Sequence, residues 1–152
     1  MPPRGGARKE ENVMFENAKR IRAKECADNA PLYFFRDLNV IYPLRKATLH
    51  IAAHGEYEVF VGKDKVGGDL LVAQSRDEHG MGFCSYDITP LVAESDFLTV
   101  RVGSGAQGSL PPTLLAQVDL AFAGGLSGCI VTDGSWLCGT DPDPTEPAVI
   151  AE

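Results

Sequence analysis

Histidines are the side chains best suited to proton transfer or metal binding near neutral pH, and this sequence has three of them, His50, His54 and His79. His50 and His54 stand four residues apart, at the point where an alternating, strand-like stretch meets a turn, so they need not share a face. A zinc site needs more converging ligands than this pair supplies. We interpret all three as surface side chains, although the polar loop around His79 could border a cleft.

Carboxylates would serve as the acid and the base of a glycosidase, but no pair is placed for that role. Such enzymes hold two carboxyl groups rigidly across the scissile bond. Asp77 and Glu78 are adjacent, and an extended chain points neighbouring side chains apart. Asp141, Asp143 and Glu146 fall in a proline-rich stretch without the loop of a calcium site. We therefore expect neither a catalytic residue nor a metal site.

A glycine-rich stretch at 103–108 resembles a phosphate-binding loop only superficially. It follows a predicted strand, but the two prolines at 111–112 stand where the helix that holds a phosphate would begin. No set of a serine, a histidine and an aspartate in the sequence indicates a catalytic nucleophile. We expect no cofactor.

Composition indicates one globular domain: 152 residues, of which 44% are hydrophobic and 23% charged. With 14 basic and 21 acidic residues the net charge is −7, which disfavours binding to nucleic acids or anionic membranes. No apolar stretch approaches the ~18 residues of a membrane span, and no secretory signal is visible. The four cysteines lack paired CxxC spacing, so we interpret them as free thiols of a cytoplasmic protein, with a disulfide or a metal role as the alternative.

Short alternating stretches separated by turns predict the secondary structure. Ala47, Leu49 and Ile51 would share one buried strand face, and we expect a hairpin at 54–55 to join this strand to the next, at 56–61. Further strands are expected across the chain, at 32–40, 70–73, 83–88, 97–102, 114–122 and 128–132. This pattern predicts an all-β antiparallel sandwich or barrel with little helix.

The domain boundaries follow from composition. Residues 1–13 are charged and rich in glycine and proline, so we predict a disordered leader. The sandwich is expected over 14–138. Residues 139–152 are acidic and proline-rich, so we predict a disordered tail or a linker.

Several phrases of the sequence, in order, resemble the N-terminal domain of bacterial α-L-rhamnosidases. The phrases that carry the resemblance lie at 15–21, 31–36, 46–61, 65–67, 86–92, 96–105, 114–122 and 132–136. The resemblance implies a jelly-roll β-sandwich of the galactose-binding-like kind. In that family the catalytic acids belong to a six-fold α/α barrel later in a much longer chain, so the resemblance assigns no catalytic residue here.

The resemblance implies an accessory domain that packs on such a barrel and shapes substrate access. An apolar surface left without that barrel would favour self-association. One alternative is a stand-alone carbohydrate-binding module for rhamnose-like sugars, and another is a structural, protein-interacting sandwich. A sugar site needs a few fixed polar groups and a stacking ring. The candidates for it are His54, Glu56, Arg76, Asp77 and Trp136.

Overall fold

The computed structural model describes residues 15, 17–24, 31–40, 43–54, 57–71, 75–76, 82–92, 97–103 and 113–151. The predicted leader, 1–13, lies outside these residues. Among the described residues no helix has both the length and the apolar character needed to cross a membrane.

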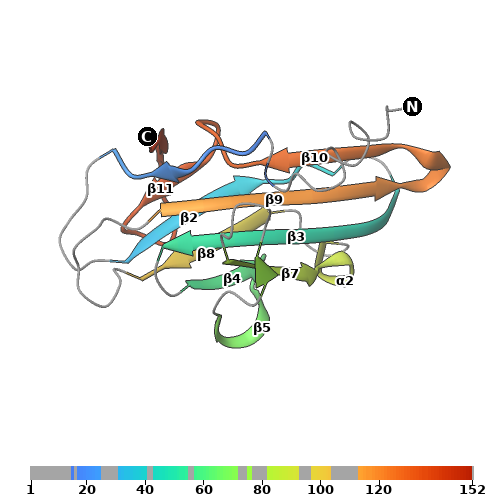
Figure 1. The fold of residues 1–152 in the computed structure, drawn as a ribbon, viewed down its shortest axis with the longest axis horizontal. Coiled ribbons are helices and arrows are strands. Elements are labelled where there is room, and N and C mark those ends of the chain that lie inside the picture. The colour runs from blue at the N-terminus through green and yellow to red at the C-terminus, as the bar shows by residue number, and fades with distance from the viewer. Residues whose placement is uncertain are drawn as a thin grey trace, which may run out of the picture.

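Two antiparallel sheets enclose one core (Figure 1). The first sheet runs in the order β13 (Val149–Ile150), β1 (Ile21–Arg22), β9 (Thr113–Phe122), β3 (Leu44–His54), β7 (Gly82–Asp87) and β6 (Ser75–Arg76), and β10 (Ser127–Val131) also pairs with β9. The second runs in the order β12 (Glu146–Pro147), β11 (Leu137–Gly139), β2 (Leu32–Asp37), β8 (Phe97–Val102), β4 (Tyr57–Val61) and β5 (Asp64–Leu71). The described helical segments are the short α2 (Thr89–Val92) and the 3₁₀ turn η1 (Ala123–Gly125). This confirms the all-β sandwich with little helix.

The core forms because the apolar residues alternate along the strands. Ala47, Leu49 and Ile51 of β3 face inward and are fully buried, as the alternation predicts. Val59 and Val61 of β4 meet them from the opposite sheet, and they are fully buried too. Each sheet therefore contributes one face to a shared interior.

The predicted hairpin at 54–55 is wrong. β3 pairs with β7 and β9 in the first sheet, whereas β4 pairs with β8 and β5 in the second. The chain thus crosses from one sheet to the other between these strands. The apolar face of an alternating strand must be covered. When the chain crosses to the opposite sheet, the apolar face of β3 and that of β4 meet in the same core. Alternation alone does not distinguish this crossing from a hairpin.

The predicted disordered tail at 139–152 is also wrong for the described residues. Cys138 of β11 pairs with Glu146 of β12, and Ile150 of β13 pairs with Ile21 of β1. Between these strands, Ala148 is only 4% exposed and its amide donates to the carbonyl of Trp136 at 2.9 Å. The segment thus supplies backbone partners to an edge of each sheet, and a proline is tolerated in such an edge strand.

Tyr57 gives this core a testable dependence on alkaline pH. The side chain is 2% exposed, and burial raises its pKa well above 10, with Cys84 and Tyr86 adding to the effect. The phenol stays protonated in the folded protein but ionises near pH 10 in the unfolded chain. Its contribution to stability is therefore complete below pH 10 and is lost as the pH rises further.

We expect Tyr57→Phe to make the free energy of unfolding fall less steeply as the pH rises above 10. Removing one such ionisation should lower the slope of unfolding free energy against pH by about 1.4 kcal/mol per pH unit above pH 10. Urea unfolding between pH 9 and 11.5 measures this slope. Tyr86→Phe should flatten the same slope, but only up to about pH 12, because burial raises the Tyr86 pKa to about 12. Equal slopes for wild type and Tyr57→Phe would contradict the prediction.

Candidate functional site

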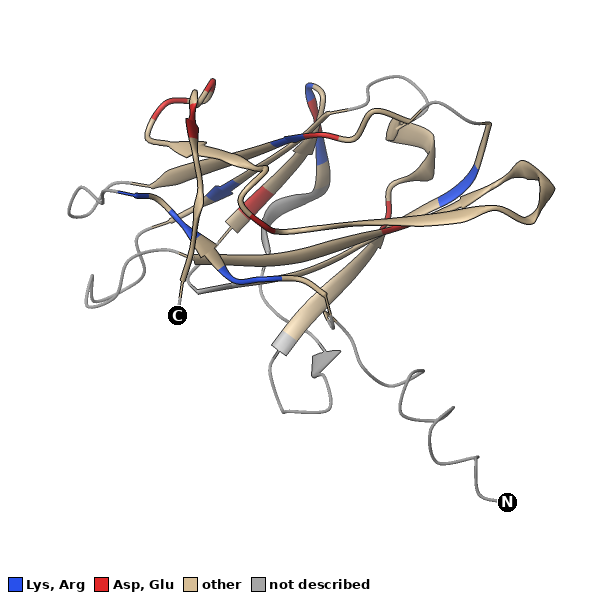
Figure 2. Cartoon of the chain, turned by 90° about the horizontal axis from the view of Figure 1, so that it is seen from above, with Lys and Arg blue, Asp and Glu red and all other residues tan. Residues whose placement is uncertain are grey.

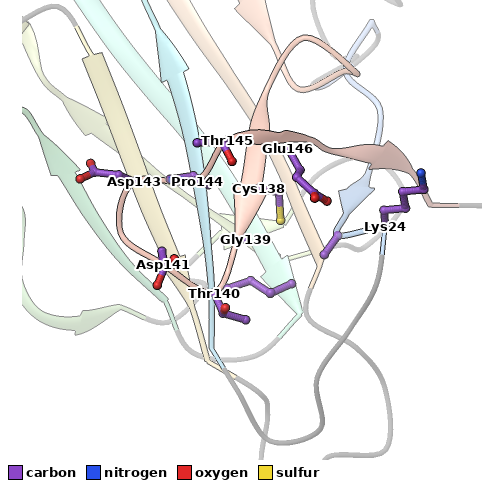
Figure 3. Close-up of a pocket in the computed structure, with 11 residues that line it drawn as sticks. Lys24, Cys138, Gly139, Thr140, Asp141, Asp143, Pro144, Thr145 and Glu146 are labelled. Atoms are coloured by element: carbon purple, nitrogen blue, oxygen red, sulfur yellow. The ribbon is translucent and has the colours of Figure 1, made fainter.

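A hollow of about 320 Å³ lies beside the β11–β12 turn (Figure 3). The residues that directly follow β1 and the first residue of β2 also line it. Its apolar lining comes from Ala23, Leu32 and Cys138, which are all buried. Its polar lining consists of the exposed residues Lys24, Thr140, Asp141, Asp143, Thr145 and Glu146. The site therefore combines an apolar base with a polar rim.

The β11–β12 turn that carries the rim is held at both ends. Cys138 pairs with Glu146 across the two strands, and it also pairs with Phe34 of β2. The turn folds back on itself closely, since a Cβ at position 139 would lie 3.4 Å from the Cβ of Pro144. The rim is thus anchored to the second sheet.

The chemistry of the rim suits a neutral molecule with several hydroxyl groups. Carboxylates accept hydrogen bonds from hydroxyls, and threonine hydroxyls can donate or accept. The three carboxylates of Asp141, Asp143 and Glu146 outnumber the ammonium of Lys24, so the local field opposes anions. None of the described residues that line the hollow is aromatic, so a sugar bound here would be held by polar contacts.

The rim does not resemble a hydrolytic centre. In Figure 3 the carboxyl groups of Asp143 and Glu146 point to opposite sides rather than toward one another. A glycosidase needs two carboxyl groups that face a common bond. Within the described ranges, no three His, Cys, Asp or Glu side chains converge as metal ligands.

The structure locates part of the predicted sugar site. His54 ends β3 and Arg76 lies in β6, with β7 between these strands in the first sheet. The side chains of His54 and Arg76, and all of Glu56 and Asp77, lie outside what the structure describes.

Trp136 occupies the core rather than the surface. The side chain is fully buried, and its indole Nε1–H donates to the carbonyl of Val131 at 2.9 Å. A stacking platform needs an open ring face. Trp136 offers none in this structure, so it acts as a packing anchor.

A second polar cluster, on the outer face of the first sheet, was not foreseen from the sequence. The His50 ring bonds the Ser85 hydroxyl through Nδ1 at 2.7 Å and an Asp119 carboxylate oxygen through Nε2 at 3.0 Å. Gln117 donates to the other Asp119 oxygen at 2.8 Å. Strand register brings these residues together, because His50 stands opposite Ser85 on β7 and Gln117 on β9. No sequence motif encodes that register.

This cluster has the residue types of a serine nucleophile and its relay, but the surroundings do not favour acyl transfer. Such chemistry needs hydrogen-bond donors aimed at a developing oxyanion. Asp87 lies two residues after Ser85, on the same face of β7, and it is exposed. Its negative charge, with that of Asp119, opposes an oxyanion. We interpret the cluster as a tie across β7, β3 and β9.

Solved structures with the same fold include α-L-rhamnosidases. The enzyme from Dictyoglumus thermophilum matches 90% of this chain with a TM-score of 0.74 and 19% identity, and the match covers 21% of that enzyme. The chain has the fold of an α-L-rhamnosidase domain. The Streptomyces avermitilis enzyme, solved with L-rhamnose, matches 90% of this chain with a TM-score of 0.67 and 21% identity over 14% of its length.

The α-L-rhamnosidase-type sandwich also occurs in a lectin. The Pleurotus ostreatus lectin matches 91% of this chain with a TM-score of 0.63 and 17% identity, and the match covers 42% of the lectin. The same lectin has been solved in complex with GalNAc. No family model and no curated protein matches the sequence. The chain spans about a fifth or less of the two rhamnosidases, so at these identities the likeness shows the fold alone.

Proposed function

We propose that this chain is an accessory domain of an α-L-rhamnosidase-like glycoside hydrolase. In this proposal it packs on a catalytic α/α barrel outside these 152 residues and shapes access to the substrate cleft. The observation that carries the proposal is the fold match, which spans 90% of this chain but 21% or less of the two rhamnosidases. A match of that kind is what one domain of a larger enzyme would produce.

The coding sequence on both sides of these residues tests this proposal. A reading frame, or an adjacent gene, that encodes a helical barrel with paired acids would support it. The chain alone should then leave an aryl α-L-rhamnoside intact, and the complete enzyme should hydrolyse it. A genome with no such barrel near this gene would refute the proposal, and so would hydrolysis by the isolated chain.

A second candidate function is carbohydrate binding by the domain itself. It is supported by the polar-rimmed hollow and by the occurrence of the same sandwich in a lectin. Sugar sites on such domains need fixed polar groups at a shallow concave surface. In this proposal the carboxylates of Asp141 and Asp143 accept hydrogen bonds from a neutral sugar.

We expect L-rhamnose at millimolar concentration to shift amide NMR signals around the β11–β12 turn. Asp141→Asn combined with Asp143→Asn should weaken binding about tenfold or more, since charge-assisted hydrogen bonds are lost. Asp64→Asn, at the exposed start of β5, is the matched control and should bind as wild type does. Glucuronate should bind more weakly than L-rhamnose, because the rim opposes anions.

The same titration also tests the sequence-based candidates. Shifts confined to His54, Glu56, Arg76 and Asp77 would move the proposed site to that part of the chain. If no amide signal shifts at ~10 mM sugar, the chain has no L-rhamnose site with a dissociation constant of about 1 mM or tighter, and the proposal of sugar binding is refuted.

A further inference from the structure

The β9–β10 hairpin is the least charged part of this acidic protein. No charged residue occurs from Leu120 to Thr132, in a chain with 14 basic and 21 acidic residues. The hairpin reaches beyond the other strands in Figure 1, and Figure 2 shows its outer end without blue or red. Leu126 at its tip is 54% exposed and is one of the two large apolar side chains exposed among the described residues.

The outer edge of β10 carries backbone groups available for pairing. Within the described part of the chain β10 pairs with β9 alone, and its first three residues are exposed. The Leu126 carbonyl and the Thr132 amide both bond toward β9, at 2.8 and 3.0 Å. Because directions alternate along a strand, the amides and carbonyls of Ser127 and Cys129 point away from β9.

Two edge strands of the second sheet carry devices that discourage pairing with another chain, and β10 does not. β5 begins with Asp64 and Lys65, and β12 consists of Glu146 and Pro147. Charged side chains and prolines are the usual protection of a sheet edge. β10 reads Ser-Gly-Cys-Ile-Val, with neither. An edge this long and this unprotected is a template for another strand.

We propose that β10 is the interface of a two-fold homodimer, in which the β10 strands of two copies pair antiparallel about Cys129. Two copies that each carry a net charge of −7 repel one another, so they can approach closely only through an uncharged surface. The stretch from Leu120 to Thr132 is such a surface, and the nearest charge is that of Asp119, opposite Cys129 on β9. Two-fold antiparallel pairing is self-complementary, since each strand offers the other the same outward groups. This inference does not depend on the proposed function.

In such a dimer the two Cys129 residues would be directly opposite, but the interface does not need a disulfide. Burial and the neighbouring Asp119 raise the pKa of Cys129 to about 11, so the thiol stays protonated near neutral pH. We therefore expect the dimer to persist in reducing agent.

Light scattering coupled to size-exclusion chromatography, from about 5 to 500 μM protein, tests the proposal. Wild type should pass from monomer to dimer over this range. Cys129→Lys should weaken the dimer at least tenfold, because it sets two like charges directly opposite across the two-fold axis. Phe97→Lys is the control, since Phe97 is the other large apolar side chain exposed among the described residues, on β8 of the second sheet. It should dimerise as wild type does.

Hydrogen exchange on wild type tests the same interface without any substitution. The amides of Ser127 and Cys129 should exchange more slowly at high protein concentration. A protein that stays monomeric throughout would overturn the proposal. A dimer that is indifferent to Cys129→Lys, or exchange in β10 that does not depend on concentration, would overturn it as well.

Discussion

Ala148→Asp should lower the free energy of unfolding by about 3 kcal/mol or more, whereas Pro147→Asp, one residue earlier, should change it by less than about 0.5 kcal/mol. Ala148 is 4% exposed and Pro147 is exposed, so the same carboxylate enters the core at one position and water at the other. Urea unfolding followed by Trp136 fluorescence measures both. The pair of variants separates a packed C-terminal segment from a merely adjacent one.

A chain that ends at Gly139 should show the same effect more strongly. It lacks β12 and β13, and with them one of the two partner strands of β11 and one of the two of β1. It also lacks the Ala148 amide that bonds the Trp136 carbonyl. We expect this shorter chain to lose most of its cooperative unfolding transition. If it unfolds as wild type does, and Ala148→Asp does too, residues 140–151 do not belong to the sandwich.

Trp136→Ala should cost about 3–5 kcal/mol of unfolding free energy, the range for large aromatic side chains removed from a core. Trp136 is the largest of the fully buried side chains, and its indole N–H donates a hydrogen bond to the Val131 carbonyl. Trp136→Phe keeps much of the volume but leaves that carbonyl without its donor, so an intermediate loss of about 1–3 kcal/mol is expected. Far-UV circular dichroism during urea unfolding measures the loss without relying on the indole.

Two comparisons test the role of Trp136 as a packing anchor. Phe97→Ala removes a partly exposed aromatic ring from β8 and should cost much less than Trp136→Ala. Trp136→Phe should also leave any L-rhamnose affinity unchanged, because the ring lies inside the core. A stable Trp136→Ala protein with weakened sugar binding would instead make Trp136 a ligand contact.

Strands and their buried faces could be predicted from the sequence, because alternation is a local property. Ala47, Leu49 and Ile51 are buried as their spacing predicts. The partner of each strand is not local, and a hairpin between β3 and β4 and a crossing between sheets require the same alternation. Choosing between them depends on β7, β8 and β9, which follow later in the chain.

The C-terminal segment and the polar clusters were missed for a related reason. Proline and acidic residues occur both in disordered tails and in short edge strands. The segment forms strands here because β1 and β11 each offer it a sheet edge, and the sequence of the segment does not show those edges. The contacts of His50 with Ser85 and Asp119 span 35 and 69 positions in the chain. Trp136 was ambiguous because a core and a sugar site both use aromatic rings.

The pairing of β1 with β13 also bears on how such a sandwich fits within a longer polypeptide. Ile21 and Ile150 are direct partners in the first sheet, so the first and last strands that the structure describes lie side by side. A unit with adjacent entry and exit can be inserted into a host chain without separating the host segments on either side. A sandwich with this arrangement needs only one surface loop of a larger protein as its point of attachment, so the core of that protein need not refold.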